Sequence, residues 1–138
     1  MKNSKIDKID TLIGNSAEIE GNIIFSGGLR IDGKVNGSVY GKNNTSTLIV
    51  SENASINGEI KVTSAFIDGA VVGSVFATDY LELKSKANIT GDVNYASMEI
   101  HLGAIISGNL IHNENNTEEK GEEIEYWKFN KYYWQCFG

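Results

Sequence analysis

Few side chains of this 138-residue chain could bind a metal or transfer a proton. Its only histidines are His101 and His112, and its single cysteine, Cys136, lies far from both in the sequence. A metal site needs three or four converging ligands, and no spacing here gathers them, so we expect both histidines to face outward from strands. No Ser-His-Asp order, phosphate-binding loop or carboxylate pair in a concave position can be identified. The sequence therefore predicts no catalytic residues, no metal and no cofactor.

Acidic side chains predominate among the charges, and the net charge is −6 at pH 7. We expect four of them on outward strand positions: Asp32, Asp68, Glu82 and Glu99. A solvated surface is the simplest interpretation, and a charged side that separates rods or meets a partner is the alternative. There is no basic stripe, so nucleic acid is not expected as a partner.

A recurring sequence motif indicates which elements must carry these side chains. It consists of a small residue, a β-branched or aliphatic residue two positions later, a glycine two positions after that, and then an aliphatic residue. Four copies occur, at residues 17–23, 54–60, 87–93 and 104–110. Two copies of a longer form occur at residues 31–39 and 67–75. The closing glycines are about 17 residues apart on average, too short a period for helical or leucine-rich repeats. Such a period means that each unit buries its apolar face by stacking on its neighbours.

Apolar and polar residues alternate within the repeats, as in Ile19–Ile23 and Met98–Leu102, which indicates strands with one buried face. Short strands at such intervals can wind into a β-helix, and about 17 residues per turn gives about six turns between residues 11 and 112. We therefore predict an all-β fold, a β-helix whose recurring glycines occupy tight corners. The absence of proline agrees with this, because proline would remove a hydrogen bond from a stacked strand.

The chain then divides into four segments: a flexible arm over 1–10, the β-helix domain over 11–112, an acidic disordered linker over 113–125 and an aromatic tail over 126–138. No run of 18 apolar residues indicates a transmembrane helix, and the polar first ten residues do not resemble a signal peptide. A single cysteine fits a reducing compartment. We expect a cytoplasmic protein.

The two ends of such a coil expose unpaired backbone groups and an open apolar column, which template further pairing unless a cap covers them. Neither end has an evident cap, so we expect end-to-end polymerisation. The alternative is that the terminal segments fold back over the ends. The candidate residues of the polymerisation interface are Leu12, Ile13, Ile19, Ile100, Leu102, Ile105, Ile106 and Leu110.

The aromatic tail contains both tryptophans of the chain and seven of its 13 aromatic residues. Three interpretations stay open: the tail packs on the last turn as a cap, binds a partner protein, or contacts a membrane surface. The candidate residues for partner or membrane contact are Trp127, Phe129, Tyr132, Tyr133, Trp134 and Phe137.

Three segments resemble the opening of the bactofilins, a family of polymer-forming bacterial cytoskeletal proteins: Thr11–Gly14, Ile19–Ile23 and Gly28–Gly37. The resemblance covers about residues 11–112. It implies a right-handed parallel β-helix of about six turns that self-assembles without nucleotide into non-polar filaments through its terminal turns. It also implies a cytoplasmic scaffold, often at the inner face of the cytoplasmic membrane, that positions cell-shape or envelope machinery. The aromatic tail departs from the family pattern.

Two other function classes fit parts of the sequence. Hexapeptide-repeat acyltransferases have turns of similar length, and four apolar residues from Ile13 to Ile31 fall at six-residue steps, but this register lapses at Gly37. Such an enzyme also needs a catalytic histidine between subunits, whereas both histidines here lie at the C-terminal end of the coil. A monomeric β-helix that displays its tail to a binding partner is the remaining alternative.

Overall fold

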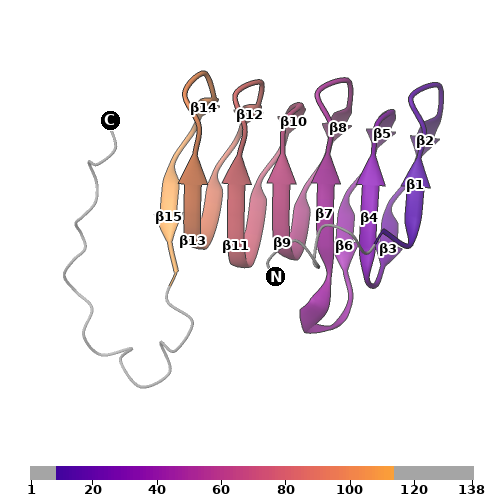
Figure 1. Ribbon diagram of the computed structural model, residues 1–138, viewed down its shortest axis with the longest axis horizontal. Helices are drawn as coiled ribbons and strands as arrows, with labels where there is room; N and C mark the ends of the chain where they lie inside the picture. Colours follow the sequence, from indigo (N-terminus) through magenta and orange to yellow (C-terminus); the bar gives the residue numbers. More distant parts are fainter. Residues whose placement is uncertain (1–8, 114–138) are drawn as a thin grey trace.

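Short parallel strands wind into a coil in the computed structural model, which describes residues 9–113 (Figure 1). In chain order the strands are β1 (Thr11–Ile13), β2 (Glu18–Glu20), β3 (Ile23–Phe25), β4 (Gly28–Ile31), β5 (Lys34–Asn36), β6 (Val39–Gly41), β7 (Thr47–Val50), β8 (Ser55–Asn57), β9 (Ile60–Ile67), β10 (Ala70–Val72), β11 (Val75–Leu83), β12 (Asn88–Thr90), β13 (Val93–Ile100), β14 (Ile105–Ser107) and β15 (Leu110–His112).

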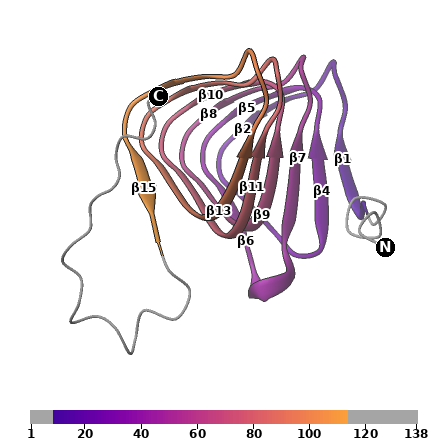
Figure 2. The ribbon, with the colours of Figure 1, turned by 60° about the vertical axis from the view of Figure 1, so that its left-hand side comes forward.

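Each turn of the coil contributes three strand segments. The first turn consists of β1, β2 and β3, and the second of β4, β5 and β6. The long strands β9, β11 and β13 bend at a corner, so each closes one turn with its first half and opens the next with its second half. All neighbouring strands pair in parallel, β14 and β15 complete the sixth turn, and Figure 2 shows the turns nested around a common axis. The all-β coil of about six turns that the repeat predicts is confirmed, as is the parallel pairing that the resemblance implies.

The core consists of aliphatic columns that run along the axis of the coil. In the six-stranded sheet, one inward position of successive turns is taken by Ile19, Val35, Ile56, Val71, Ile89 and Ile106. The inner four of these side chains are at most 1% exposed, because a turn covers them on both sides. In-register parallel pairing keeps equivalent positions above one another, so the period of the sequence becomes a continuous core.

Glycines form the corner that follows the six-stranded sheet, and the stacking of the turns explains why. A Cβ atom on Gly58 would collide with the carbonyl oxygen of Gly37 one turn earlier, and a Cβ on Gly108 would collide with that of Gly91. Gly73 and Gly91 also have a φ of 145°, which disfavours other residues. The close approach of the backbone in successive turns therefore requires the recurring glycine of the sequence motif.

The interval between Gly37 and Gly58 is longer than the others because part of it lies outside the coil. After β6 the chain forms the 3-10 helix η1 (Asn43–Thr45), and Figure 1 shows this loop projecting between β6 and β7. Ser46 fixes the loop, since its Oγ accepts a hydrogen bond from the Thr63 backbone N–H (3.1 Å). Within residues 9–113, η1 is the only helix, and no helix there is long and apolar enough to span a membrane.

Only the last two residues of the predicted N-terminal arm are described, and Asp10 is bonded to the second turn. Its backbone N–H donates to the carbonyl oxygen of Gly28 (2.8 Å), and the Gly28 N–H donates to Asp10 Oδ2 (3.0 Å). The rest of the arm, the linker beyond residue 113 and the aromatic tail with its six candidate contact residues lie outside the described residues.

Candidate assembly surfaces at the two ends of the coil

The N-terminal turn leaves three columns of the core open. Ile13, Ile19 and Ile23 occupy the inward register positions of β1, β2 and β3. Their partners in the second turn are fully buried, whereas these three side chains are only half-buried. Within residues 9–113 no turn covers them on the outer side, so this end of the described coil is an apolar surface continuous with the core.

The C-terminal turn is built in the same way. Ile106 and Leu110 are inward residues of β14 and β15 and are half-buried. Ile100 ends the column that passes through the fully buried Leu83, and it is 48% exposed. The two ends of the coil therefore present similar aliphatic surfaces.

Backbone hydrogen-bonding groups are also open at these two ends. In the part of the chain that the structure describes, β1, β2 and β3 pair only with strands of the second turn, and β14 and β15 pair only with strands of the fifth. Each outer edge therefore presents N–H and C=O groups to a further strand. An open apolar column framed by open strand edges can be completed by a second coil stacked on it.

The eight residues predicted for the polymerisation interface occupy two kinds of position. Five lie on the open columns: Ile13, Ile19, Ile100, Ile106 and Leu110. The other three lie around the rim of the terminal turns. Leu12 is the register partner of Arg30 and is 59% exposed. Ile105 is the register partner of Asn88 and points outward. Leu102 lies in the turn after β13 and is 94% exposed.

The predicted interface omitted three apolar residues at the ends of the coil. Ile23 completes the open column of the N-terminal turn, whereas Ile24 on β3 and Ile111 on β15 are exposed on the rims of the terminal turns. The position of Ile23 could have been predicted, because Ile23 is the last residue of the first copy of the motif, just as Leu110 is the last residue of the fourth copy.

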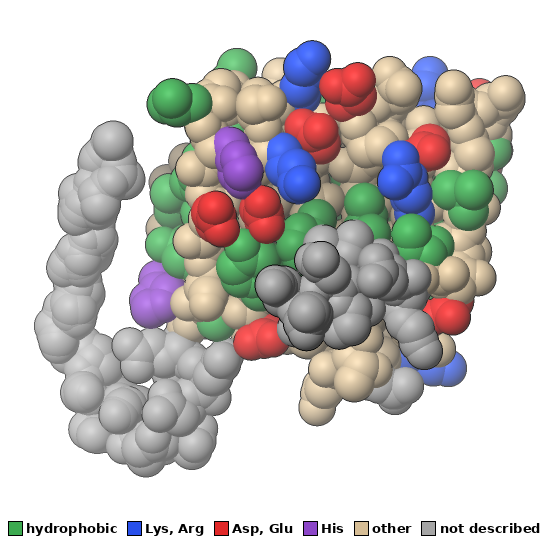
Figure 3. Space-filling view, viewed as in Figure 1, with side chains coloured by type: hydrophobic (Ala, Val, Ile, Leu, Met, Phe, Trp, Pro, Cys, Tyr) green, Lys and Arg blue, Asp and Glu red, His purple; other side chains and the backbone are tan. Residues whose placement is uncertain are grey.

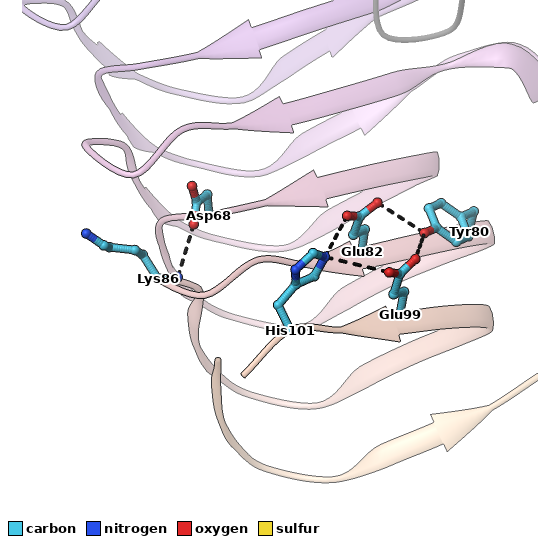
Figure 4. Close-up of polar contacts among 6 residues, drawn as sticks. All are labelled: Asp68, Tyr80, Glu82, Lys86, Glu99 and His101. Carbon is cyan, nitrogen blue, oxygen red and sulfur yellow. Dashed lines mark hydrogen bonds and ion pairs between the residues drawn. The ribbon is translucent and has the colours of Figure 1, made fainter. Parts of the chain in front are cut away.

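A polar cluster lies on the outer surface of the last two turns, close to the C-terminal end (Figure 4). Glu82 and Glu99 are register partners on β11 and β13, and His101 follows β13 directly. His101 Nε2 lies 2.8 Å from Glu82 Oε2 and 3.8 Å from Glu99 Oε2. The Tyr80 hydroxyl lies 3.1 Å from Glu82 Oε1 and 3.0 Å from Glu99 Oε1. The stacking of turns therefore pairs two carboxylates that are 17 residues apart in the sequence.

This cluster is the group of described residues that could hold a metal ion. One ligand atom from each of Glu82, Glu99 and His101 lies within 4.8 Å of the others. Both histidines are exposed, as expected from the sequence, but the expectation that no ligands converge was wrong for Glu82, Glu99 and His101. The cluster is visible only with the register between turns, because Glu82 belongs to one turn and Glu99 and His101 belong to the next.

The cluster also affects the acidity of its tyrosine. Partial burial, hydrogen bonds to Glu99 and Glu82 and the negative charge of both carboxylates raise the pKa of Tyr80 above its ordinary value. The hydroxyl has one proton, so it donates to one carboxylate at a time. Tyr80 therefore stays neutral and offsets part of the repulsion between two like charges on adjacent strands.

Asp32 and Asp68 were expected on outward strand positions, and this was wrong. They lie in the turns that follow β4 and β9, where the chain leaves one sheet for the next. Asp32 Oδ1 accepts a hydrogen bond from Arg30 Nε (2.9 Å), and Asp68 Oδ1 accepts one from the backbone N–H of Lys86 in the following turn (3.0 Å, Figure 4). Figure 3 shows charges of both signs on this side of the coil, with hydrophobic side chains between them.

Comparison with known proteins gives consistent matches. The family model Bactofilin, described as polymer-forming cytoskeletal, matches residues 11–111. Bactofilin BacO of Myxococcus xanthus is 32% identical over 101 residues, which cover 73% of this chain and 78% of BacO. Bactofilin BacP of the same organism is 29% identical over 101 residues, and the match spans only 41% of BacP.

A solved structure is similar as well. The cryo-EM reconstruction of Thermus thermophilus bactofilin double helical filaments matches with a TM-score of 0.66 and 27% identity. The match covers 75% of this chain and all of that chain.

Proposed function

The chain belongs to the bactofilin family of polymer-forming cytoskeletal proteins, and from this membership we propose that it stacks end to end, without nucleotide, into non-polar filaments. The observation that supports this most directly is the pair of uncovered core columns, which end in Ile19 on one side and Ile106 on the other. The structural match to a bactofilin reconstructed as double helical filaments supports assembly into filaments.

The gain in free energy comes from completing burial at each joint. A fully buried aliphatic side chain is stabilised by about 1.5–3 kcal/mol relative to an exposed one, so three half-buried residues per end contribute several kcal/mol. Pairing of the open strand edges adds directional hydrogen bonds and fixes the rotation of one coil on the next. Neither contribution requires a nucleotide.

A non-polar filament joins like ends, so each joint has a twofold axis and the same residues on both sides. The N-terminal columns then meet a second set of N-terminal columns, and the C-terminal columns meet a second C-terminal set. Such a filament in the cytoplasm would serve as a scaffold for cell-shape or envelope machinery, with contacts to the inner face of the membrane. The family is one of structural proteins, which favours this role over the acyltransferase alternative.

Electron microscopy of two single-end variants and the double variant tests the proposal. Ile19→Arg and Ile106→Arg each place a charge on one open column, where burial without a partner is unfavourable. In a non-polar filament each single variant retains one kind of joint, so we expect dimers, and the double variant should be monomeric. In a head-to-tail filament either single variant would abolish every joint and leave monomers.

Matched controls use the outward neighbours on the same strands. Glu20→Arg on β2 and Ser107→Arg on β14 introduce the same side chain on exposed outward positions. We expect both controls to form filaments without added nucleotide. Filaments from the double variant would show that the open columns are not the interface, and monodisperse wild-type particles would overturn the polymer proposal itself.

A further inference from the structure

We propose that the aromatic segment 126–138 binds back onto the rim of the C-terminal turn of its own chain and competes there with end-to-end stacking. The binding contact stands independently of the proposed function, whereas the competition rests on it. The occupied surface, named here the C-terminal patch, consists of Ile100, Leu102 and Ile105 around the corner between β13 and β14, together with the pair Glu82 and Glu99 on β11 and β13.

The aliphatic residues of the C-terminal patch are exposed and lie close to an open strand edge. Leu102 is 94% exposed and Ile105 is 53% exposed, and both are aliphatic residues on the rim of the last turn. Aromatic side chains that pack on such residues bury about 150–250 Å² each. The outer edges of β14 and β15 also present backbone groups to which an extended segment can pair, as in strand addition to a sheet edge.

The course of the chain places the segment next to this patch. The last strand, β15, ends at His112 on the C-terminal turn, so the chain continues from this end of the coil. Twelve residues, 114–125, separate the described part from the aromatic segment, and they can span at most about 40 Å. A tether of this length gives the segment an effective concentration in the millimolar range at the C-terminal turn.

The charges of the segment complement those of the patch. Lys128 and Lys131 stand among the aromatic residues, and residues 126–138 contain no Asp or Glu. Glu82 and Glu99 are paired with each other across adjacent strands, and within residues 9–113 neither carboxylate forms an ion pair with a lysine or arginine. An ammonium group at this position would offset the repulsion between the two carboxylates.

Binding of the tail would regulate assembly at one end only. A coil whose C-terminal rim is occupied by the tail can still stack through its N-terminal columns, so the full chain would accumulate as N-to-N dimers before filaments appear. If bound and free tails are in a tenfold ratio, which corresponds to about 1.4 kcal/mol, the concentration required for the C-terminal joint rises by about tenfold.

Tryptophan fluorescence measures the contact directly, because Trp127 and Trp134 are the only tryptophans and both lie in the segment. The experiment uses dilute full-length protein, shown to be monomeric by light scattering. We expect blue-shifted emission that iodide quenches poorly in the wild type. In the double variant Leu102→Glu/Ile105→Glu we expect red-shifted emission and strong quenching.

A matched control separates this contact from general apolar adhesion. Leu12→Glu/Ile24→Glu makes the same change on the rim of the N-terminal turn, where both side chains are exposed, and it should leave the emission blue-shifted. Red, fully quenched emission in the wild type would overturn the proposal. So would a blue shift that appears only on adding vesicles of phosphatidylglycerol and phosphatidylethanolamine, since that would identify a membrane contact.

The competition is tested with a full-length variant in which Phe129, Tyr132 and Phe137 are changed to serine and both tryptophans are kept. We expect red-shifted emission and filaments at about one tenth of the wild-type protein concentration. Equal assembly concentrations for variant and wild type would overturn the competition. A blue-shifted wild type with no filaments from either protein would support the contact and contradict the proposed function, so the two failures are distinguishable.

Discussion

Ile89 and Ile106 are register partners on β12 and β14, yet Ile89 is fully buried and Ile106 is only half-buried. The two side chains are identical and occupy equivalent inward positions, so the difference arises because the described residues contain no further turn beyond Ile106. The difference in burial along one column thus indicates how much additional burial a joint between two coils would give the side chain at its end.

Truncation of these two isoleucines should therefore have unequal effects on the isolated coil. We expect Ile89→Ala to lower the free energy of unfolding by about 2–5 kcal/mol, the range for buried aliphatic residues. Ile106→Ala should cost about 1–2 kcal/mol, because its side chain already contacts solvent. Urea unfolding of dilute protein measures both values.

In filament assembly we expect the opposite order, with Ile106→Ala having the larger direct effect. Ile106→Ala removes contacts at the joint and should raise the concentration required for assembly, whereas Ile89→Ala should alter assembly only through its loss of stability. Equal effects of the two substitutions on the unfolding of the monomer would contradict the open-column description of the end.

Gly58→Ala should destabilise the coil through a clash between turns. The added Cβ would collide with the backbone of Gly37, which cannot move without disturbing the neighbouring strand pairs. We expect a loss of about 1–3 kcal/mol or more in the free energy of unfolding, as for other overpacked positions. Thermal unfolding followed by circular dichroism checks this.

Gly14→Ala is the control for this substitution. It lies in the first turn, where a Cβ would meet nothing within 4 Å, and we expect little change in the melting temperature. A melting temperature for Gly58→Ala equal to that of Gly14→Ala would show that the close approach of Gly37 and Gly58 is not required.

The repeat in the sequence was sufficient to predict the architecture of the coil. Ile19, Gly21 and Ile23 recur as a unit because an inward aliphatic, a corner glycine and a second inward aliphatic are required once per turn. Fold class and number of turns follow from that unit, since parallel stacking leaves few other ways to bury its apolar positions.

Contacts between side chains of different turns were not predictable in this way. Glu82, Glu99 and His101 come together only if β11 and β13 pair in one particular register, and irregular intervals such as the η1 loop obscure that register in the sequence. Likewise Leu12 was predicted to lie at the interface because it is aliphatic. Side chains alternate between the two faces of β1, so Leu12 points outward beside Arg30 while Ile13 points inward.

Tyr80 makes the stability of the coil sensitive to alkaline pH. Its pKa is raised by partial burial, by hydrogen bonds to Glu99 and Glu82 and by their negative charge, whereas a tyrosine in the unfolded chain titrates near pH 10. Above that pH the unfolded state loses this proton while the folded state keeps it. The unfolded state then binds fewer protons, so the free energy of unfolding falls as pH rises, and this contribution is fully present below pH 10.

Tyr80→Phe removes this particular dependence. We expect the variant to be less stable than the wild type at pH 8, because the carboxylates of Glu82 and Glu99 lose their neutral donor. Its stability should then decline less steeply above pH 10. Urea midpoints at pH 8, 9, 10 and 11 measure the slopes, and tyrosinate absorbance should show one late-titrating tyrosine that the variant lacks. Parallel slopes for the two proteins would mean that Tyr80 titrates in the folded coil as it does in the unfolded chain, and that the stacked carboxylates do not hold its proton.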